Sequence, residues 1–151
     1  MRVLWTVNSF PPLIAKKFGY PSGHAISWVE AMSKRLKEVP NITLAIATSK
    51  GRLTSPERKN IDGICYYAVP RYIKDEDSWK QIIHEFKPDI IHAYGTELKH
   101  NLVVEEVAGD IPVIISLQGI LSEYQNHYYA GIDVSTFFKY IESSASMMGG
   151  F

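Results

Sequence analysis

The sequence contains a single cysteine, Cys65, and no long run of apolar residues. One cysteine excludes a disulfide framework and a cysteine-based zinc site, and we expect Cys65 to be a small core residue. No apolar stretch approaches the ~20 residues of a membrane-spanning helix. The apolar start, residues 2–7, is broken early by Asn8, Ser9 and two prolines, which is unlike a signal peptide. These absences favour a reducing compartment, and we expect a cytoplasmic protein.

An excess of charge of one sign is also missing, because Lys plus Arg and Asp plus Glu each number 16 among 151 residues. A neutral chain lacks the positive surface that nucleic-acid binders carry, so we expect no nucleic-acid partner. Apolar residues make up 46% and charged residues 21%, which is the composition of a globular protein rather than a disordered one. The length suits one domain with a sizeable core. We therefore expect residues 1–151 to form a single domain.

Several catalytic signatures are absent as well. No GxGxxG sequence follows the first apolar run and no Walker A motif occurs, which removes the usual dinucleotide and nucleotide-triphosphate loops. The five histidines show no HExxH or other metal-ligand spacing, so no metal and no cofactor are expected. No GxSxG nucleophile elbow is present. The residues by themselves define no specific reaction.

The apolar pattern alternates between short strand-like runs and helical periods. Such alternation is typical of a parallel sheet covered by helices, with right-handed crossovers. We predict an α/β fold with a doubly wound, Rossmann-like parallel sheet in the order 3-2-1-4-5 and helices on both faces. Residues 8–22 and 49–62 are predicted as loops. The predicted strands are 2–7, 42–47, 63–69, 89–93 and 111–117, and the predicted helices are 23–38, 78–86, 97–107 and 135–147.

The stretch from Asp89 to Glu97 ends a predicted strand, turns and begins a helix, for which Thr96 is the predicted N-cap. In open parallel sheets, ligands bind at the carboxyl ends of the strands. The segments that follow the first and fifth strands reach the same edge. We therefore predict a cleft formed by Asn8, Tyr94, Gly95, Thr96, Glu97, Gln118 and Gly119.

Ser22 and Gly23 stand immediately before the predicted helix 23–38. The free backbone N–H groups at a helix start suit an anion such as phosphate. The alternative is that Gly23 only lets the helix pack closely on the sheet. The residues alone leave both interpretations open.

Three further segments, taken together and in order, carry a family resemblance. Residues 3–12 with 22–36 (VLWTVNSFPP and SGHAISWVEAMSKRL), 87–97 (KPDIIHAYGTE) and 111–119 (IPVIISLQG) resemble the N-terminal domain of a retaining glycosyltransferase of the GT-B fold. The closest group is the family-4 type. The resemblance covers the chain up to about residue 130, and its specificity comes from the order and spacing of the three segments.

The resemblance implies roles for some of these residues. The backbone of Ser22 and Gly23 would approach the donor diphosphate, and residues 88–95 would shape the acceptor side of the cleft. Tyr94 and Gln118 stand where the family pattern has histidines, and a glutamine cannot titrate near neutral pH. The resemblance therefore implies no certain catalytic residue in this chain.

The implied reaction transfers a sugar from a nucleotide-sugar donor to an acceptor hydroxyl, with retention and without a metal or cofactor. It would serve cell-surface polysaccharide or glycolipid synthesis, with a sugar or lipid-linked acceptor. The C-terminal domain that binds the donor in such enzymes has no counterpart in this sequence, so we expect this chain alone to be inactive.

Two alternatives stay open. Lys16, Lys17, Phe18 and Tyr20 form a basic–aromatic segment that could contact the inner face of a membrane peripherally. The chain could also be a non-catalytic α/β binding or interaction module. A flavin-binding module would be yellow when purified, and a response regulator would need acidic residues where Asn8 stands.

Overall fold

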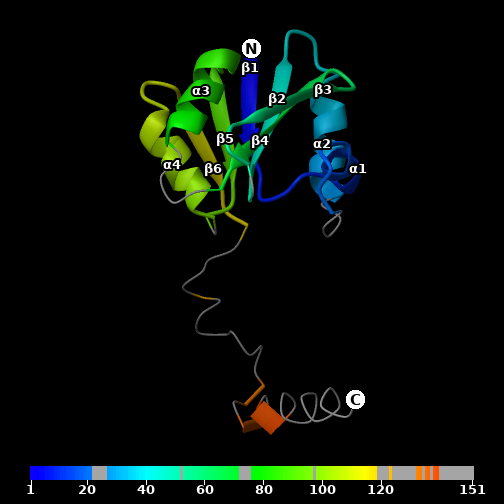
Figure 1. Ribbon diagram of the computed structural model, residues 1–151, viewed down its shortest axis with the longest axis vertical. Helices are drawn as coiled ribbons and strands as arrows, with labels where there is room; N and C mark the ends of the chain where they lie inside the picture. The colour runs from blue at the N-terminus through cyan, green and yellow to red at the C-terminus, as the bar shows by residue number, and fades with distance from the viewer. Residues whose placement is uncertain are drawn as a thin grey trace. The chain divides into compact units, whose positions relative to one another are not determined.

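A computed structural model describes residues 1–21, 27–51, 53–71, 76–96 and 98–118, and in the C-terminal part residues 123, 132–133, 135–136 and 138–139. The chain divides into two compact units, Met1–Gln118 and Gly119–Phe151. The strands and helices described below belong to the first unit (Figure 1).

The first unit is built on a six-stranded mixed sheet in the order β3-β4-β2-β1-β5-β6. All neighbouring strands are parallel except β3 and β4, which are antiparallel. The α/β class predicted from the sequence is confirmed. The strands are β1 (Arg2–Thr6), β2 (Thr43–Lys50), β3 (Glu57–Ile61), β4 (Ile64–Pro70), β5 (Ile90–Tyr94) and β6 (Val113–Ser116).

Strand β3 corrects the prediction of a wholly parallel sheet, because it falls in residues 49–62, which were predicted as a loop. Its connection to β4 is the pair Asp62 and Gly63, with φ angles of 50° and 80°. Two positive φ angles define the tight hairpin turn that Asp-Gly favours. Four of the five β3 residues are exposed, as suits a polar edge strand that resists pairing with other chains. The observed order therefore differs from the predicted one by an added edge strand, and the five parallel strands stand in the order β4-β2-β1-β5-β6.

Helices cover both faces of the sheet, with α1 and α2 on one side and α3 and α4 on the other (Figure 1). The predicted long loop 8–22 was wrong in part, because it contains the short helix α1. Pro12 is its first residue, a position where the missing N–H costs nothing. The helices are α1 (Pro12–Lys17), α2 (Ser27–Leu36), α3 (Glu76–Phe86) and α4 (Lys99–Val107).

Two hydrophobic clusters lie on opposite faces of the sheet, because successive strand residues point in opposite directions. Trp5 packs in the cluster under α1 and α2, whereas its neighbour Leu4 packs in the cluster under α3 and α4. Burial of both faces explains why β1 and β2 read as continuous apolar runs. On α3, Trp79 and Ile82 are fully buried, and each contributes about 1.5–3 kcal/mol by burial.

The start of α4 corrects a second prediction. The helix begins at Lys99 rather than Glu97, and its N-cap residue is Leu98, which makes no side-chain capping hydrogen bond. Thr96 is exposed and is not the N-cap. The turn before α4 is stabilised instead by a buried residue inside the helix, as described below.

In the second unit, Asp133 precedes helical residues and accepts hydrogen bonds from them. Its carboxylate accepts from the Ser135 hydroxyl at 2.6 Å and from the Thr136 N–H at 2.9 Å and hydroxyl at 2.6 Å. These hydrogen bonds hold the pKa of Asp133 below its usual range. The predicted helix 135–147 otherwise lies outside the described residues. Within the described part of the chain, no helix is both long and apolar enough to cross a bilayer.

Candidate functional site

The carboxyl ends of β1, β5 and β6 lie next to one another and bring distant segments together. The register pairs Thr6 with Ala93 and Tyr94 with Ser116. Just beyond these strands, the Asn8 side-chain amide donates a hydrogen bond to Gln118 Oε1 at 3.1 Å. Two residues predicted for the site are therefore in direct contact across 110 positions of sequence.

The turn after β5 is fixed by its backbone and by Gly95. The Gly95 N–H donates to the Ser116 carbonyl oxygen at 2.8 Å, which extends the pairing of β5 and β6 by one residue. Gly95 has φ 84°, a conformation that other residues rarely adopt. The chain can therefore turn sharply beside the end of β6 before α4 begins.

Asn101, in the first turns of α4, connects this turn to β1. Its side-chain amide donates to the carbonyl oxygens of Tyr94 and Gly95 at 3.1 and 2.7 Å. Its Oδ1 accepts a hydrogen bond from the Thr6 hydroxyl at 2.5 Å. Asn101 and Thr6 are buried, so these polar groups satisfy one another where water is excluded. Sequence reasoning missed Asn101, since a lone asparagine inside a helix belongs to no motif.

Four aromatic rings surround the end of β5. Tyr94 stacks on His92 with ring centroids 4.1 Å apart, and it also contacts Trp28 at 4.7 Å and Trp5 at 5.3 Å. The His92 Nε2 lies 2.7 Å from the Ser116 hydroxyl oxygen. Burial lowers the pKa of His92, so its imidazole is neutral at pH 7. The end of β5 is therefore covered by a cluster of packed aromatic side chains that includes the neutral imidazole of His92.

Several buried polar atoms at this edge have no hydrogen-bond partner among the described residues. They are Asn8 Oδ1, Thr48 Oγ1, the Tyr94 hydroxyl and, beyond α1, the Tyr20 hydroxyl. Leaving a buried polar group unpaired costs about 1–3 kcal/mol. Such groups call for an explanation, and a bound ligand is one. Asn8 lies just beyond β1, Tyr94 is the last residue of β5, and Thr48 lies near the end of β2.

Lys50, the last residue of β2, and Arg71, just after β4, form a positively charged corner of the carboxyl edge. The Lys50 ammonium is 5.6 Å from the Tyr20 ring centre and 5.8 Å from that of Phe10, which places it over two aromatic faces. Burial, and then the nearby charge of Arg71, lower the pKa of Lys50. An anionic group bound here would offset the repulsion between the two cations.

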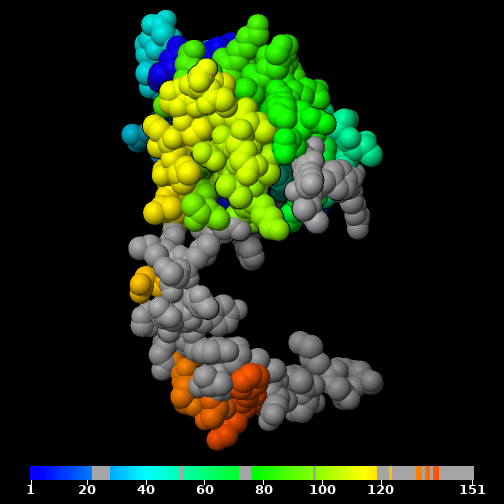
Figure 2. Space-filling view, turned by 90° about the vertical axis from the view of Figure 1, so that its left-hand side faces the viewer, coloured from blue at the N-terminus to red at the C-terminus, as the bar shows by residue number. Residues whose placement is uncertain are grey.

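A cavity of about 410 Å³ lies between the β5–α4 turn, the outer side of α4 and β6. Gly95 and Thr96 line it together with Leu102 and Ile115. Figure 2 looks onto this side of the first unit, where α4 and β6 reach the surface. Leu102 is 61% exposed and Ile115 45%, so the cavity has an apolar, open rim.

The remaining predictions for the site have separate outcomes. Ser22, Gly23, Glu97 and Gly119 lie outside the described residues. Of the basic–aromatic segment, Phe18 is buried and stacks on Phe10, so it belongs to the core. Across the residues that the structure describes, no group of three or more His, Cys, Asp or Glu side chains is placed to hold a metal ion.

Comparison of the chain with protein-family models, with curated proteins and with solved structures finds no match. The geometry of the carboxyl edge therefore has to be interpreted on its own chemistry. It combines amide side chains, a neutral imidazole, aromatic surfaces and one positive corner. These groups can bind a polar, hydroxyl-rich or anionic ligand.

Proposed function

We propose that this chain is the N-terminal, acceptor-side domain of a family-4-type retaining glycosyltransferase of the GT-B fold. In this proposal the sheet is a doubly wound Rossmann-like sheet, and a further domain binds the nucleotide-sugar donor. The reaction transfers the sugar to an acceptor hydroxyl in cell-surface polysaccharide or glycolipid synthesis, on the cytoplasmic side. The proposal is supported by the sequence resemblance and by the order β4-β2-β1-β5-β6 of the parallel strands.

The observation that carries the proposal is the contact between Asn8, after β1, and Gln118, after β6, because β5 lies between these strands and ends at Tyr94. All three positions belong to segments on which the resemblance rests. An amide can both donate and accept, so Asn8 and Gln118 suit the hydroxyl groups of a sugar. Gln118 is exposed and can exchange its bond to Asn8 for one to a ligand.

Each part of the edge has a proposed task. The amides of Asn8 and Gln118 orient the acceptor hydroxyl, and the unpartnered Tyr94 hydroxyl supplies a further hydrogen-bonding group at the end of β5. In this proposal the chain contributes to catalysis chiefly by orienting the two reactants. Ser22 and Gly23 are proposed to form one wall of the donor diphosphate site. No resident metal or cofactor takes part in this proposal.

The proposal is tested by titrating the ¹⁵N-labelled chain with mono- and disaccharides and, separately, with UDP- and GDP-sugars. We expect saccharides to shift the amide signals of residues 8, 94–96 and 116–118. We expect nucleotide sugars to bind with a Kd no tighter than about 1 mM, which corresponds to about −4 kcal/mol, because the donor domain supplies most of their contacts. Micromolar nucleotide-sugar binding to this chain alone, or no saccharide response at these residues, would contradict the proposal.

A non-catalytic interaction module is a second candidate, and the surface around the α4–β6 cavity favours it. Leu102, Ile115 and Leu117 are exposed there, at 61%, 45% and 65%. Grouped apolar side chains on a surface often mark a protein interface. In this case saccharides would leave the carboxyl edge unchanged, while Leu102→Ser would abolish association with the partner without altering the free energy of unfolding by more than about 0.5 kcal/mol.

A further inference from the structure

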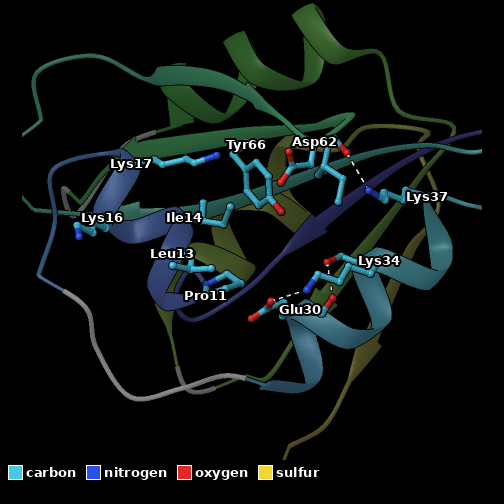
Figure 3. Close-up of a pocket in the computed structure, with 12 residues that line it drawn as sticks. Pro11, Leu13, Ile14, Lys16, Lys17, Glu30, Lys34, Lys37, Asp62 and Tyr66 are labelled. Carbon is cyan, nitrogen blue, oxygen red and sulfur yellow. Dashed lines mark hydrogen bonds and ion pairs between the residues drawn. The ribbon is translucent and has the colours of Figure 1, made fainter.

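A second cavity lies on the face of the sheet that α1 and α2 cover (Figure 3). Its volume is about 410 Å³. Lys37, at the end of α2, donates a hydrogen bond to the Asp62 carbonyl oxygen at 3.2 Å, which places one end of the cavity at the β3–β4 hairpin. That hairpin precedes β4, so this end lies at the amino edge of the sheet. None of the residues predicted for the carboxyl-edge site lines the cavity.

The floor of this cavity is apolar. Ile14 comes from α1, and Ile64 and Tyr66 come from β4; all three are buried in the hydrophobic cluster under α1 and α2. Leu13 stands at the rim and is 67% exposed. A ligand with an apolar body would therefore bury both the floor and the Leu13 side chain, a favourable change at about 25 cal/mol per Å².

The rim of the cavity is positively charged. Two lysines of α1, one of α2 and Lys37 just after α2 line it, together with Glu30 and Asp62 (Figure 3). Lys34 is occupied by an ion pair with Glu30 at 2.7 Å. Within the described part of the chain, the ammonium groups of Lys16 and Lys17 make no hydrogen bond or ion pair. The two lysines at the end of α1 are therefore free to bind an anion.

Tyr66 adds a polar group to the apolar floor. Burial raises the pKa of Tyr66 to about 12, while the neighbouring Ser33 hydroxyl acts in the opposite direction. The phenol therefore stays protonated across the neutral pH range and can donate a hydrogen bond to a ligand. It cannot neutralise the lysines, so the positive rim persists at physiological pH.

We propose that this cavity binds an anionic amphiphile, with its aliphatic or aromatic body on Ile14, Ile64 and Tyr66 and its carboxylate or phosphate at Lys16 and Lys17. This site is separate from the proposed sugar-transfer edge and does not depend on it. An apolar floor with charged groups at one rim is the usual construction of a small-molecule site. The same anionic chemistry could come from a free amphiphile or from the headgroup of an anionic lipid.

The first test titrates the ¹⁵N-labelled chain with decanoate below its micellar concentration, with decyl maltoside as a neutral amphiphile of equal chain length, and with inorganic phosphate. We expect decanoate to shift the amides of residues 13–17, 33–37 and 62–66 in a saturable way. It should bind at least tenfold more tightly than the neutral amphiphile, and phosphate alone should bind more weakly than decanoate. Equal affinity for both amphiphiles, or saturable shifts confined to other residues, would overturn the proposal.

Matched lysine variants identify the groups that recognise the anion. The double variant Lys16→Gln with Lys17→Gln should bind decanoate about tenfold more weakly, since each exposed lysine contributes modestly. The control Lys80→Gln with Lys87→Gln removes the same charge from exposed positions elsewhere and should leave the affinity unchanged. Both pairs are exposed, so folding is retained. An equal loss in the two double variants would mean that net charge, not the cavity, attracts the ligand.

Binding to lipid vesicles distinguishes the headgroup of an anionic lipid from a free amphiphile as the source of the anion. Co-sedimentation with phosphatidylglycerol vesicles that is absent with phosphatidylcholine, and that is lost in the Lys16 and Lys17 double variant, would identify a lipid headgroup. Decanoate binding without vesicle binding would identify a free amphiphile. Saturable binding in neither arm would overturn the proposal.

Discussion

The amino and carboxyl edges of the sheet differ in whether their polar groups have hydrogen-bond partners. At the amino edge, the Arg2 N–H donates to the Asp89 carboxylate at 2.6 Å, and Arg2 Nε donates to the Phe86 carbonyl oxygen at 2.5 Å. The Arg2 guanidinium also lies 4.5 Å from the centre of the Phe86 ring. The N-terminal ammonium of Met1 donates to the Asn41 carbonyl oxygen at 2.5 Å. These polar groups of the amino edge are therefore hydrogen-bonded within the protein.

The carboxyl edge, in contrast, keeps buried polar atoms without partners among the described residues. Asn8, Thr48 and Tyr94 each carry one such atom. The amino edge therefore stabilises the fold, whereas the carboxyl edge keeps unpartnered polar atoms, which we propose bond to a ligand. Asn101 differs from these residues of the carboxyl edge, because both polar groups of its side chain are hydrogen-bonded. We therefore assign it a structural role.

The largest effect is expected from Asn101→Ala. The change leaves the carbonyl oxygens of Tyr94 and Gly95 and the Thr6 hydroxyl without their partner, so the free energy of unfolding should fall by about 3 kcal/mol. Urea denaturation measures the loss. The exposed Asn60→Ala on β3 is the matched control and should change stability by less than about 0.5 kcal/mol. Equal effects in the two variants would show that Asn101 does not hold the turn.

His100 should make the free energy of unfolding depend on pH in the acidic range. Burial, and then the charge of Arg71, lower the pKa of His100 from 6.5 to about 4. The folded state therefore favours the neutral ring, and its stability is greatest above pH 6.5 and falls as the pH drops towards 4, by up to about 3 kcal/mol. His100→Leu should flatten this pH dependence, whereas the exposed His84→Gln should preserve it. An unchanged slope in His100→Leu would refute the assignment.

At the amino edge, Arg2→Ala should lower the free energy of unfolding by about 2 kcal/mol. It removes the hydrogen bond to the Phe86 carbonyl oxygen and the contact of the guanidinium with the Phe86 ring. The exposed Arg35→Ala on α2 removes the same charge without these contacts. Thermal unfolding should separate the two variants by several degrees, and identical melting temperatures would mean that Arg2 is not a structural residue.

The smallest expected effects concern two buried threonines on neighbouring strands, of which one hydroxyl is hydrogen-bonded and the other is not. Thr6 bonds to Asn101, whereas the Thr48 hydroxyl has no partner among the described residues. Thr6→Val should therefore cost about 1–2 kcal/mol, and Thr48→Val should stabilise the chain by about 0.5–1 kcal/mol. Chemical denaturation of both variants checks the signs. A loss of stability in Thr48→Val equal to that in Thr6→Val would remove the distinction between bonded and unbonded groups.

Much of the fold could be predicted from the apolar pattern, because strands buried on both faces carry long apolar runs. The strand β3 could not be found this way, since its only buried residue is Ile61 and its polar side chains face water. The Asp62–Gly63 pair was the available signal, and it was overlooked. The short helix α1 was missed because three prolines and Gly19 within residues 8–22 suggested a loop, although Pro12 starts the helix.

The candidate site could be predicted at the level of its backbone. Asn8, Gly95 and Gln118 follow strands, and the topology of a parallel sheet is enough to place them at one edge. Side-chain bonds depend on packing between distant elements, so the roles of Asn101 and Lys50 could not be read from local sequence. Thr96 illustrates the limit, since its residue type suits an N-cap but the helix begins later.

The most direct test of the proposed role of the carboxyl edge is a paired measurement on Tyr94→Phe and, as the bonded control, Tyr67→Phe. Tyr67 donates its hydroxyl to Glu85 at 3.3 Å, whereas the Tyr94 hydroxyl has no partner among the described residues. For each variant, the affinity for the best-binding saccharide is measured by ¹⁵N titration, and the free energy of unfolding by urea.

Tyr94→Phe should lower the affinity about tenfold while stability stays equal or rises. Tyr67→Phe should lower stability and leave the affinity unchanged. Unchanged affinity in Tyr94→Phe, or a loss of stability above about 1 kcal/mol in that variant, would contradict the conclusion that the carboxyl edge keeps its polar groups for a ligand.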